Sequence, residues 1–467
     1  MSIATVTSAW EGQGERELLA ELAPSAGRDE RKKLLWIFAA ALTIRLIVAY
    51  FELPGHLNPR LDHFPFGYET GRVARAIALG QGFSNPFHGP SGPTALLPPV
   101  YPYLLAGVFK LFGVYTKASA IAILALNSLF SALTCLPIYY AAKKSFGPRT
   151  ALGASWAWAL FPHAIYLSAY LIWDQCLTTL LLTLLFLAAL HLAEKGTGLK
   201  PGHYNSMDLW GWAGFGLLYG FAALTNPIVL AVLPFLAGWM CYRLHRQGKP
   251  WFLQACTLGI VLGLCLTPWM ARNYRTFHRF IPFRDGFWLE MYAGNTGDDS
   301  EFRPGWAHPG SSSSEWEEYR RVGELDYMAE KRHQAVNFIK THPAWFAKAT
   351  VHRISFLWTG VGILPAPYRM SALFDPDEPF SLMNIVIYAS LTVLMLFGLR
   401  RAFRERNVEA VPYALVLFVL PLVYYVTHPD LRFRHPIDPE AVILAVYAVC
   451  GRFGRSVISI QERTVAA

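Results

Sequence analysis

Long uninterrupted apolar runs constrain the fold of this chain more than any other feature. Hydrophobic residues make up 54% of its 467 residues and charged residues only 16%, whereas soluble domains carry about 25% charged residues. A bilayer is crossed by a helix of about 20 apolar residues, which satisfies its own backbone hydrogen bonds. The runs lie at 34–53, 119–142, 150–166, 174–193, 208–224, 227–242, 252–270, 381–398, 410–427 and 437–451. They predict an all-α integral membrane protein, a polytopic bundle of about 10–11 transmembrane helices.

The positions of the basic residues predict how the chain is oriented. The net charge is +9, but the basic clusters occupy short loops between apolar runs, which is typical of the positive-inside rule and not of a nucleic-acid surface. If the semi-apolar stretch 97–115 does not cross the membrane, these clusters all fall on the cytosolic side, as do both termini. The clusters comprise Lys143, Lys144, Arg149, Lys195, Arg243, Arg246, Lys249, Arg400, Arg401, Arg404, Arg406, Arg452 and Arg455.

This topology divides the chain into five parts. They are a cytosolic tail (1–33), a transmembrane module with a first outer loop at 54–118 (34–270), an outer-face segment (271–380), C-terminal transmembrane helices (381–451) and a second cytosolic tail (452–467). In the outer-face segment, Ser314 and Glu317 form a capping-box pattern that predicts a charged helix to about residue 340. His342-Pro343 ends that helix, and 344–358 reads as an amphipathic helix at the membrane interface.

Several motifs are missing from the sequence. None of the six cysteines belongs to a CxxC pair, and the histidines show no zinc-binding H-x-x-E-H type of spacing. We therefore predict no disulfide framework, no metal site and no bound cofactor; the alternative of a divalent metal ion stays open. The polar N-terminus lacks the pattern of a cleaved signal peptide.

Carboxylates on the outer side, next to spans, are the candidates for chemistry, because charge at the membrane edge is costly unless it is used or paired. Glu69 begins an amphipathic helix in the first outer loop and is a candidate general base, with Asp62 as a rival. The plain alternative for Glu69 is a surface pair with Arg72. Asp174 opens a span on the outer side, and its plain alternative is an N-cap.

Cations of two outer segments are candidates for holding a lipid phosphate. The first set follows the span that ends at TPWMARNY and the second lies in the loop THPDLRFRHPIDPE; bulk lipid contact and a salt-bridged loop are the respective alternatives. The two sets consist of Arg272, Arg275, Arg279 and Arg284, and of Arg432, Arg434 and His435. Tyr101 follows Pro98-Pro99 where a short helix would wall a lipid groove, unless these residues only form a turn and an interface anchor.

Several stretches together resemble the polytopic GT-C glycosyltransferases, and family 39 in particular, which includes protein O-mannosyltransferases and the lipid A aminoarabinose transferase. The similar stretches are GYETGRVARAIALGQGF, LLPPVYPYLLAGVFKLFGVY, AAKKSFGPRTALGASWAWALFPHAIYLSAYLIWDQCL, GFAALTNPIVLAVLPF, TPWMARNYRTFHRFIPFRDGFWLEMYAGN and RFRHPIDPEAVILAV. They cover roughly 35–450 of the chain.

The resemblance implies transfer of a sugar from a polyprenyl-phosphate donor to a glycan, lipid or protein acceptor. The transfer would take place on the outer face of a bacterial inner membrane. Glu69 matches the family's acidic base, although many members have an Asp-Glu pair where this chain has Tyr68-Glu69. Asp174 matches a second acidic position, and the Arg272 region and Arg434 or His435 would correspond to basic residues near the donor phosphate. Arg72 is a separate candidate for substrate binding. The sequence leaves two alternatives: a transporter or flippase of lipid-linked saccharides, and a noncatalytic scaffold protein.

Overall fold

A computed structural model describes residues 3–170, 172–194, 206–296, 308–361, 382–428 and 430–450, with the backbone alone for 3–28. Lys195, Arg452, Arg455 and the C-terminal tail 452–467 lie outside these ranges.

The described residues form helices, with one isolated β-bridge between Ser84 and Pro93. The α-helices are α1 (Ile3–His56), α2 (Tyr68–Ala78), α3 (Val100–Phe112), α4 (Lys117–Leu133), α5 (Cys135–Phe146), α6 (Pro148–Ala159), α7 (Pro162–Tyr170), α8 (Gln175–Leu192), α9 (Ser206–Thr225), α10 (Leu233–Arg246), α11 (Phe252–Phe277), α12 (Phe287–Asn295), α13 (Ser313–Val322), α14 (Glu324–Thr341), α15 (Pro343–Thr359), α17 (Leu382–Arg404), α18 (Ala410–Val419) and α19 (Leu422–Val426). The 3₁₀ helices are η1 (Pro59–Leu61), η2 (Phe64–Phe66), η3 (Pro227–Ala231), η5 (Leu431–Phe433) and η6 (His435–Ile437). A last helix covers 438–450.

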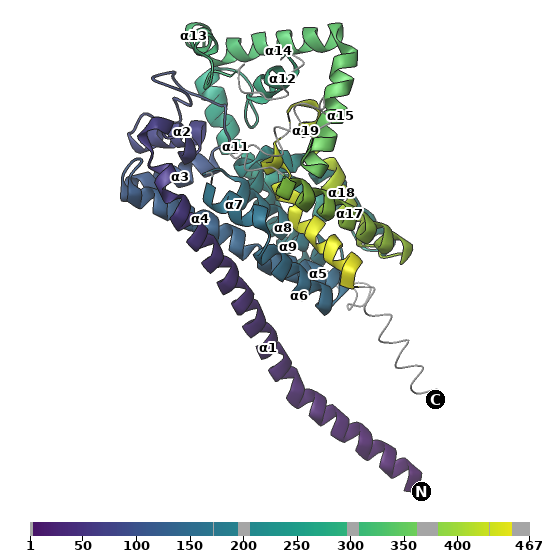
Figure 1. Ribbon diagram of the computed structural model, residues 1–467. Coiled ribbons are helices and arrows are strands. Elements are labelled where there is room, and N and C mark those ends of the chain that lie inside the picture. The colour runs from purple at the N-terminus through teal and green to yellow at the C-terminus, as the bar shows by residue number, and fades with distance from the viewer. Residues whose placement is uncertain are drawn as a thin grey trace.

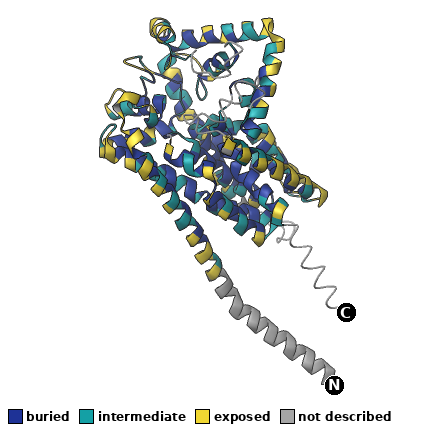
Figure 2. Cartoon of the chain, in the orientation of Figure 1, coloured by how far each residue is buried: buried dark blue, intermediate teal, exposed yellow. Residues whose placement is uncertain are grey.

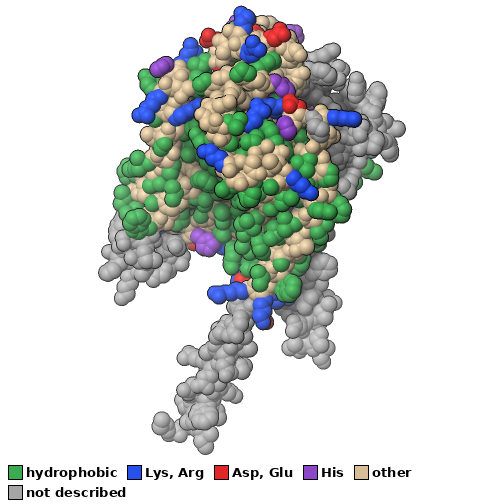
Figure 3. Space-filling model, turned by 90° about the vertical axis from the view of Figure 1, so that its left-hand side faces the viewer, with side chains coloured by type: hydrophobic (Ala, Val, Ile, Leu, Met, Phe, Trp, Pro, Cys, Tyr) green, Lys and Arg blue, Asp and Glu red, His purple; other side chains and the backbone are tan. Residues whose placement is uncertain are grey.

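Five helical segments of the described chain are long and apolar enough to cross a membrane. They are Asp29–His56, Lys117–Phe146, Gln175–Leu192, Phe252–Phe277 and Ile385–Arg404, and shorter apolar helices cover Val100–Phe112, Leu209–Thr225 and Ala410–Val426. Buried residues are concentrated in the centre of the bundle (Figure 2). Large apolar side chains are exposed on its flank, where Figure 3 shows a hydrophobic belt with Lys and Arg above and below it. The predicted all-α membrane bundle is confirmed.

Some predicted spans are broken helices. The run 150–166 forms α6 and α7, because Pro162 has no N–H to continue the hydrogen-bond ladder. The carbonyls of Trp158 and Ala159 at the end of α6 accept instead from the fully buried Arg45 guanidinium of α1, at 3.1 and 2.9 Å. This arginine satisfies the broken helix end and fixes α7 against α1. As expected, α3 is short: its 13 residues fall below the length of a span.

Helices α12 to α15 form a cap above one end of the bundle (Figure 1). The predicted amphipathic stretch forms α15, which begins at Pro343. The predicted capping box was misplaced, because Ser312 is the N-cap and its hydroxyl accepts from the Glu315 backbone N–H. The charged helix is also interrupted, since Gly323 (φ 82°) separates α13 from α14.

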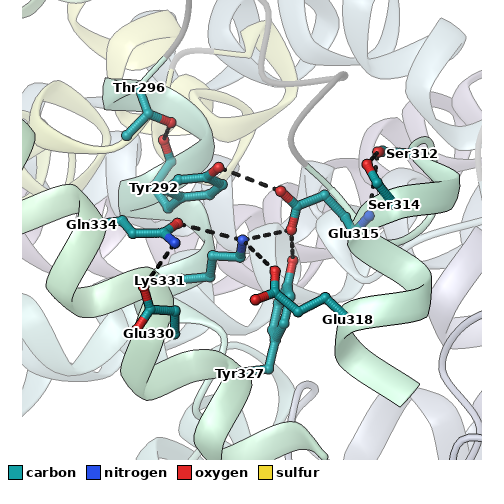
Figure 4. Close-up of polar contacts among 10 residues, drawn as sticks. All are labelled: Tyr292, Thr296, Ser312, Ser314, Glu315, Glu318, Tyr327, Glu330, Lys331 and Gln334. Carbon is teal, nitrogen blue, oxygen red and sulfur yellow. Dashed lines mark hydrogen bonds and ion pairs between the residues drawn. The ribbon is translucent and has the colours of Figure 1, made fainter. Parts of the chain in front are cut away.

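A buried lysine holds the cap together (Figure 4). Lys331 of α14 is 1% exposed, and its ammonium lies 2.7 Å from Glu315 and 3.1 Å from Glu318, both on α13. Tyr327 of α14 and Tyr292 of α12 donate hydrogen bonds to the Glu315 carboxylate. A buried charge is tolerated only when paired in this way, so the cluster sets the positions of α12, α13 and α14.

A pair of carboxyl groups joins the cap to the first outer loop. Glu324 accepts hydrogen bonds from the Thr94 hydroxyl, the Ala95 N–H and the Tyr319 hydroxyl at 2.5 to 2.6 Å. Burial, and then the negative charge of Glu324, raise the pKa of Asp285 well above its usual value. Both effects favour the protonated, neutral form of Asp285.

The Asp285→Asn variant should lose part of the pH dependence of stability. A carboxyl whose folded pKa is raised stabilises the protein below its unfolded pKa, and this contribution is lost as pH rises through the folded pKa. Each unit of pKa shift corresponds to about 1.4 kcal/mol. The thermal unfolding temperature of the wild type in detergent should fall more between pH 5 and pH 9 than that of Asp285→Asn. Asp326→Asn, on a carboxyl that is 71% exposed, is the control and should follow the wild type. Parallel curves for Asp285→Asn and the wild type would contradict the assignment.

Candidate active site

A cavity of about 630 Å³ lies between the bundle and the cap. Its walls come from the start of α2, the start of α8, α12, the segment before α13, and the chain from α19 to η5. The acidic side chains that line it are Glu69, Asp174 and Glu290, and the basic ones are Arg284, Arg432, His308 and His428. Aromatic side chains such as Trp173 and Phe287 complete the lining. The cavity thus combines both signs of charge with stacking surfaces.

A close backbone approach brings α2 to the start of α8. Gly67, the N-cap of α2, has φ 86°, and a Cβ there would lie 2.1 Å from the Ile172 carbonyl oxygen. Beside it, the Ile172 N–H donates to the Pro65 carbonyl at 3.3 Å. Only glycine fits this conformation and this spacing. Through this contact the helix that carries Glu69 lies against the segment that leads to Asp174.

Glu69 occupies the first turn of α2, and its side chain is 19% exposed, toward the cavity. The imidazole of His308 lies beside it, with Nε2 at 3.6 Å from Oε1. Burial raises the pKa of Glu69, and His308 only partly opposes the shift. The neighbouring Tyr68 hydroxyl donates to the Gly310 carbonyl at 2.6 Å and so fixes the His308 segment against α2. A carboxylate with a raised pKa is the better proton acceptor.

Asp174 does not cap α8 with its side chain. Its Oδ2 instead accepts from the Thr178 hydroxyl and from the Asn226 amide, each at 2.9 Å. Burial raises the pKa of Asp174, and the two hydrogen bonds oppose that shift. The side chain of Asp174 therefore does not serve as a helix cap. Its carboxylate is fixed at the cavity wall by these two hydrogen bonds.

Glu290 of α12 has the opposite electrostatic environment from Glu69. Its carboxylate lies 3.3 Å from His428 and 3.5 Å from Arg284. Burial alone would raise the pKa of Glu290, but the electrostatic effects of His428 and Arg284 hold it below its usual value. Burial lowers the pKa of His428 itself, so Arg284 is the permanent cation beside Glu290. Glu290 therefore stays ionised and orients both partners. Two glutamates of one cavity with pKa values shifted in opposite directions are typical of divided catalytic roles.

Arg432 forms a flat cationic wall. Its guanidinium lies 3.4 Å from the centre of the Trp173 ring and pairs with Asp430 at 3.1 Å. Stacking keeps the planar fork of donors in place. Arg432 is thus preorganised to meet an anion in the cavity.

The structure leaves other predicted site residues outside the cavity. Asp62 is 60% exposed and pairs with Arg72 at 2.6 Å, and Arg72 also stacks on the Tyr68 ring. The buried Tyr101 hydroxyl donates to Asn127. Arg272 donates to the carbonyls of Thr94 and Phe83. These contacts lie within the protein and outside the cavity, so the structure does not bring these side chains together with Glu69 and Asp174.

Three more predicted binding residues lie elsewhere. Arg275 is exposed on α11 and does not line the cavity. Arg434 is fully buried. It pairs with Asp438 at 2.9 Å and donates a hydrogen bond to the Trp358 carbonyl at 3.1 Å. His435 is buried beside Asp438. The alternative of a salt-bridged loop therefore describes Arg434, while Arg432 from the same loop reaches the cavity.

Sequence reasoning missed Glu290, His308 and His428 as site residues. His428 stands in the polar loop already singled out, and Glu290 lies in the stretch FRDGFWLEMYAGN that contributes to the family resemblance. His308 carries no local signal, because its role depends on contact with a residue of α2. Of the described residues, the group close enough to hold a metal ion is His163, His435 and Asp438, outside the cavity.

Comparison with known proteins gives a family match over part of the chain and a shared fold. Residues 97–270 match the family described as dolichyl-phosphate-mannose-protein mannosyltransferase. No curated protein matches the sequence closely enough to count as a relative. The matched region includes Asp174 and begins after Glu69. The chain is an integral multi-pass membrane protein.

Solved structures show the same fold at low sequence identity. The oligosaccharyltransferase AglB from Archaeoglobus fulgidus, in complex with an inhibitory peptide and a dolichol-phosphate, aligns with a TM-score of 0.55 at 14% identity, over 94% of this chain and 52% of that one. Its apo form aligns at 0.52 and 13%, over 92% and 52%. ArnT from Cupriavidus metallidurans bound to undecaprenyl phosphate aligns at 0.37 and 14%, over 90% and 77%, a TM-score too low to show a shared fold. The chain spans about half the length of the oligosaccharyltransferase. The resemblance to GT-C transferases is confirmed.

Replacement of Gly67 should disrupt the cavity. Gly67→Ala adds left-handed strain of about 1–2 kcal/mol and a clash with the Ile172 carbonyl. Gly80→Ala is the matched control, because Gly80 also has positive φ (79°) but its Cβ would meet nothing within 4 Å. Thermal unfolding should show a larger loss of stability for Gly67→Ala than for Gly80→Ala. Equal losses would mean that the contact with Ile172 is unimportant.

Proposed function

We propose that the protein is a membrane glycosyltransferase that moves a sugar from a polyprenyl-phosphate-linked donor to a hydroxyl or amine acceptor. The observation that carries this proposal is one cavity lined by Glu69, Asp174, Arg284 and Arg432. These residues come from separate segments of the chain, and the fold brings them together between the bundle and the cap. The family match and the shared fold support the same chemistry.

The proposed reaction is a single displacement that inverts the anomeric carbon. Glu69 accepts the proton of the acceptor group as its oxygen or nitrogen attacks that carbon. The bond from the anomeric carbon to the phosphate oxygen breaks, and the phosphate leaves with the electron pair. A phosphate needs no proton to leave, but its growing charge needs cations. Arg432 and Arg284 supply them, while Asp174 orients the acceptor or a sugar hydroxyl.

The cavity would open on the outer face of the membrane. Basic residues at the ends of the spans, including Lys143 and Lys144 on α5 and Arg401 and Arg404 on α17, favour a cytosolic position for the opposite end of the bundle. The periplasmic face of a bacterial inner membrane fits this orientation. There, a glycan, a lipid or a protein would be the acceptor.

Glu69→Gln should lower kcat/KM by about 10²- to 10⁴-fold, the usual contribution of a general base. Because the pKa of Glu69 is raised, the wild-type rate should increase with pH along an acid limb that lies above the usual glutamate value of about 4.3. Sugar transfer from a polyprenyl-phosphate donor in liposomes measures both effects.

Two variants make the assignment of Glu69 specific. Asp62→Asn tests the rival carboxylate and should keep the acid limb of the pH profile. Glu330→Gln alters an exposed residue of α14 and should behave as the wild type. A fully active Glu69→Gln, or an Asp62→Asn variant that loses the acid limb, would show that Glu69 is not the base.

Arg432→Gln should raise the KM for the donor by about tenfold to a hundredfold, as expected for the loss of a hydrogen bond to a charged group worth about 1.5–3 kcal/mol. Arg275→Gln removes an exposed arginine outside the cavity and should leave this KM unchanged. Initial rates over a range of donor concentrations separate KM from kcat. If Arg275→Gln and Arg432→Gln raise KM equally, the phosphate does not bind at Arg432.

A further inference from the structure

A second polar cluster lies inside the bundle, away from the cavity. It consists of His163 on α7, His435 at the start of η6 and Asp438 at the start of the last helix, all at most 3% exposed. One ligand atom from each of the three side chains lies within 4.8 Å of the others. The Trp158 ring stacks on His435 at 5.3 Å and closes one side of the cluster.

Polar atoms of this cluster lack partners within the described structure. Neither ring nitrogen of His435 has a hydrogen-bond partner, and neither does Asp438 Oδ2. Leaving such buried groups unsatisfied costs about 1–3 kcal/mol each. Unpaired buried atoms of this kind call for an explanation, for which a bound ion is one of the known forms.

Neighbouring groups fix side chains of this cluster. Arg434 Nε donates to Asp438 Oδ1 at 2.9 Å, which leaves Oδ2 turned toward the His435 ring, 3.7 Å from Nδ1. The His163 ring is hydrogen-bonded to the backbone of Leu431. Metal-binding histidines and carboxylates are commonly fixed by such outer partners.

We propose that His163, His435 and Asp438 bind a divalent transition metal of the zinc type. Two imidazole nitrogens and one carboxylate oxygen form a ligand set that such ions accept, with distances of about 2.0–2.2 Å to each atom. The spacing along the chain gave no indication of this site, because the ligands come from two distant segments.

The ion would have a structural role beneath the cavity. His163 lies on α7, which leads toward Trp173, and His435 follows Arg432 by three residues. Trp173 and Arg432 stack on each other at 3.4 Å in the cavity wall. A metal that joins the two segments would therefore hold this wall in place. None of its three ligands lines the cavity.

Metal analysis of the purified full-length protein in detergent tests the site. Elemental analysis should find about one zinc-type ion per chain, and after chelation Co²⁺ should restore the site with the visible absorption of a low-symmetry cobalt centre. His435→Gln and Asp438→Asn should lose this absorption. His342→Gln, on an exposed histidine, should keep it.

A ligand exchange separates metal binding from a packing role. His163→Cys keeps a metal-binding atom, so its Co²⁺ form should gain a thiolate-to-cobalt charge-transfer band that the wild type lacks. This band appears only if residue 163 binds the ion, and size-exclusion profiles verify folding. Absence of metal and of cobalt absorption in the wild type overturns the proposal, as does an unchanged cobalt spectrum in His435→Gln or His163→Cys.

Discussion

The candidate site depends on one backbone contact, in which Gly67 lies against the Ile172 carbonyl with no room for a side chain. This contact places the first turn of α2 beside the start of α8, and so brings the carboxylates of Glu69 and Asp174 to one cavity. The break of α6 before Pro162 and the capture of its carbonyls by Arg45 fix α7, which leads to Ile172. Irregular backbone at membrane depth is tolerated when its polar groups are satisfied in this way.

The acidic side chains that the fold brings into the cavity differ in their electrostatic surroundings. Burial raises the pKa of Glu69, whereas His428 and Arg284 lower that of Glu290 against the effect of burial. One glutamate is thereby suited to accept a proton, and the other stays ionised and orients Arg284. Arg432 is fixed by stacking on Trp173. A proton-accepting carboxylate together with fixed cations supports transfer from a donor whose leaving group is an anion. Such a reaction needs a base for the acceptor and positive charge for the leaving group.

The fold class and part of the site follow from the sequence. Apolar runs predict the bundle. Glu69 and Asp174 stand out because each begins a helix beside a span, where a charged side chain is costly unless it is paired or used in chemistry. The misplaced capping box shows the limit of local patterns, since both Ser312 and Ser314 precede an acidic residue at the same spacing. Arg432 and Arg434 are alike in sequence, and only tertiary contacts direct one to the cavity and the other to Asp438.

Glu290 and His308 show why the rest of the site was not predictable. Their importance lies in contacts with His428 and Glu69, far away along the chain, and local periodicity contains no information on such pairs. The most direct measurement of the central claim is an experimental structure with a bound polyprenyl phosphate. The phosphate should lie within hydrogen-bonding distance of Arg432 or Arg284. Glu69 should face it across the open cavity. A phosphate bound beyond reach of both arginines, or a cavity that is not joined to Glu69, would contradict it.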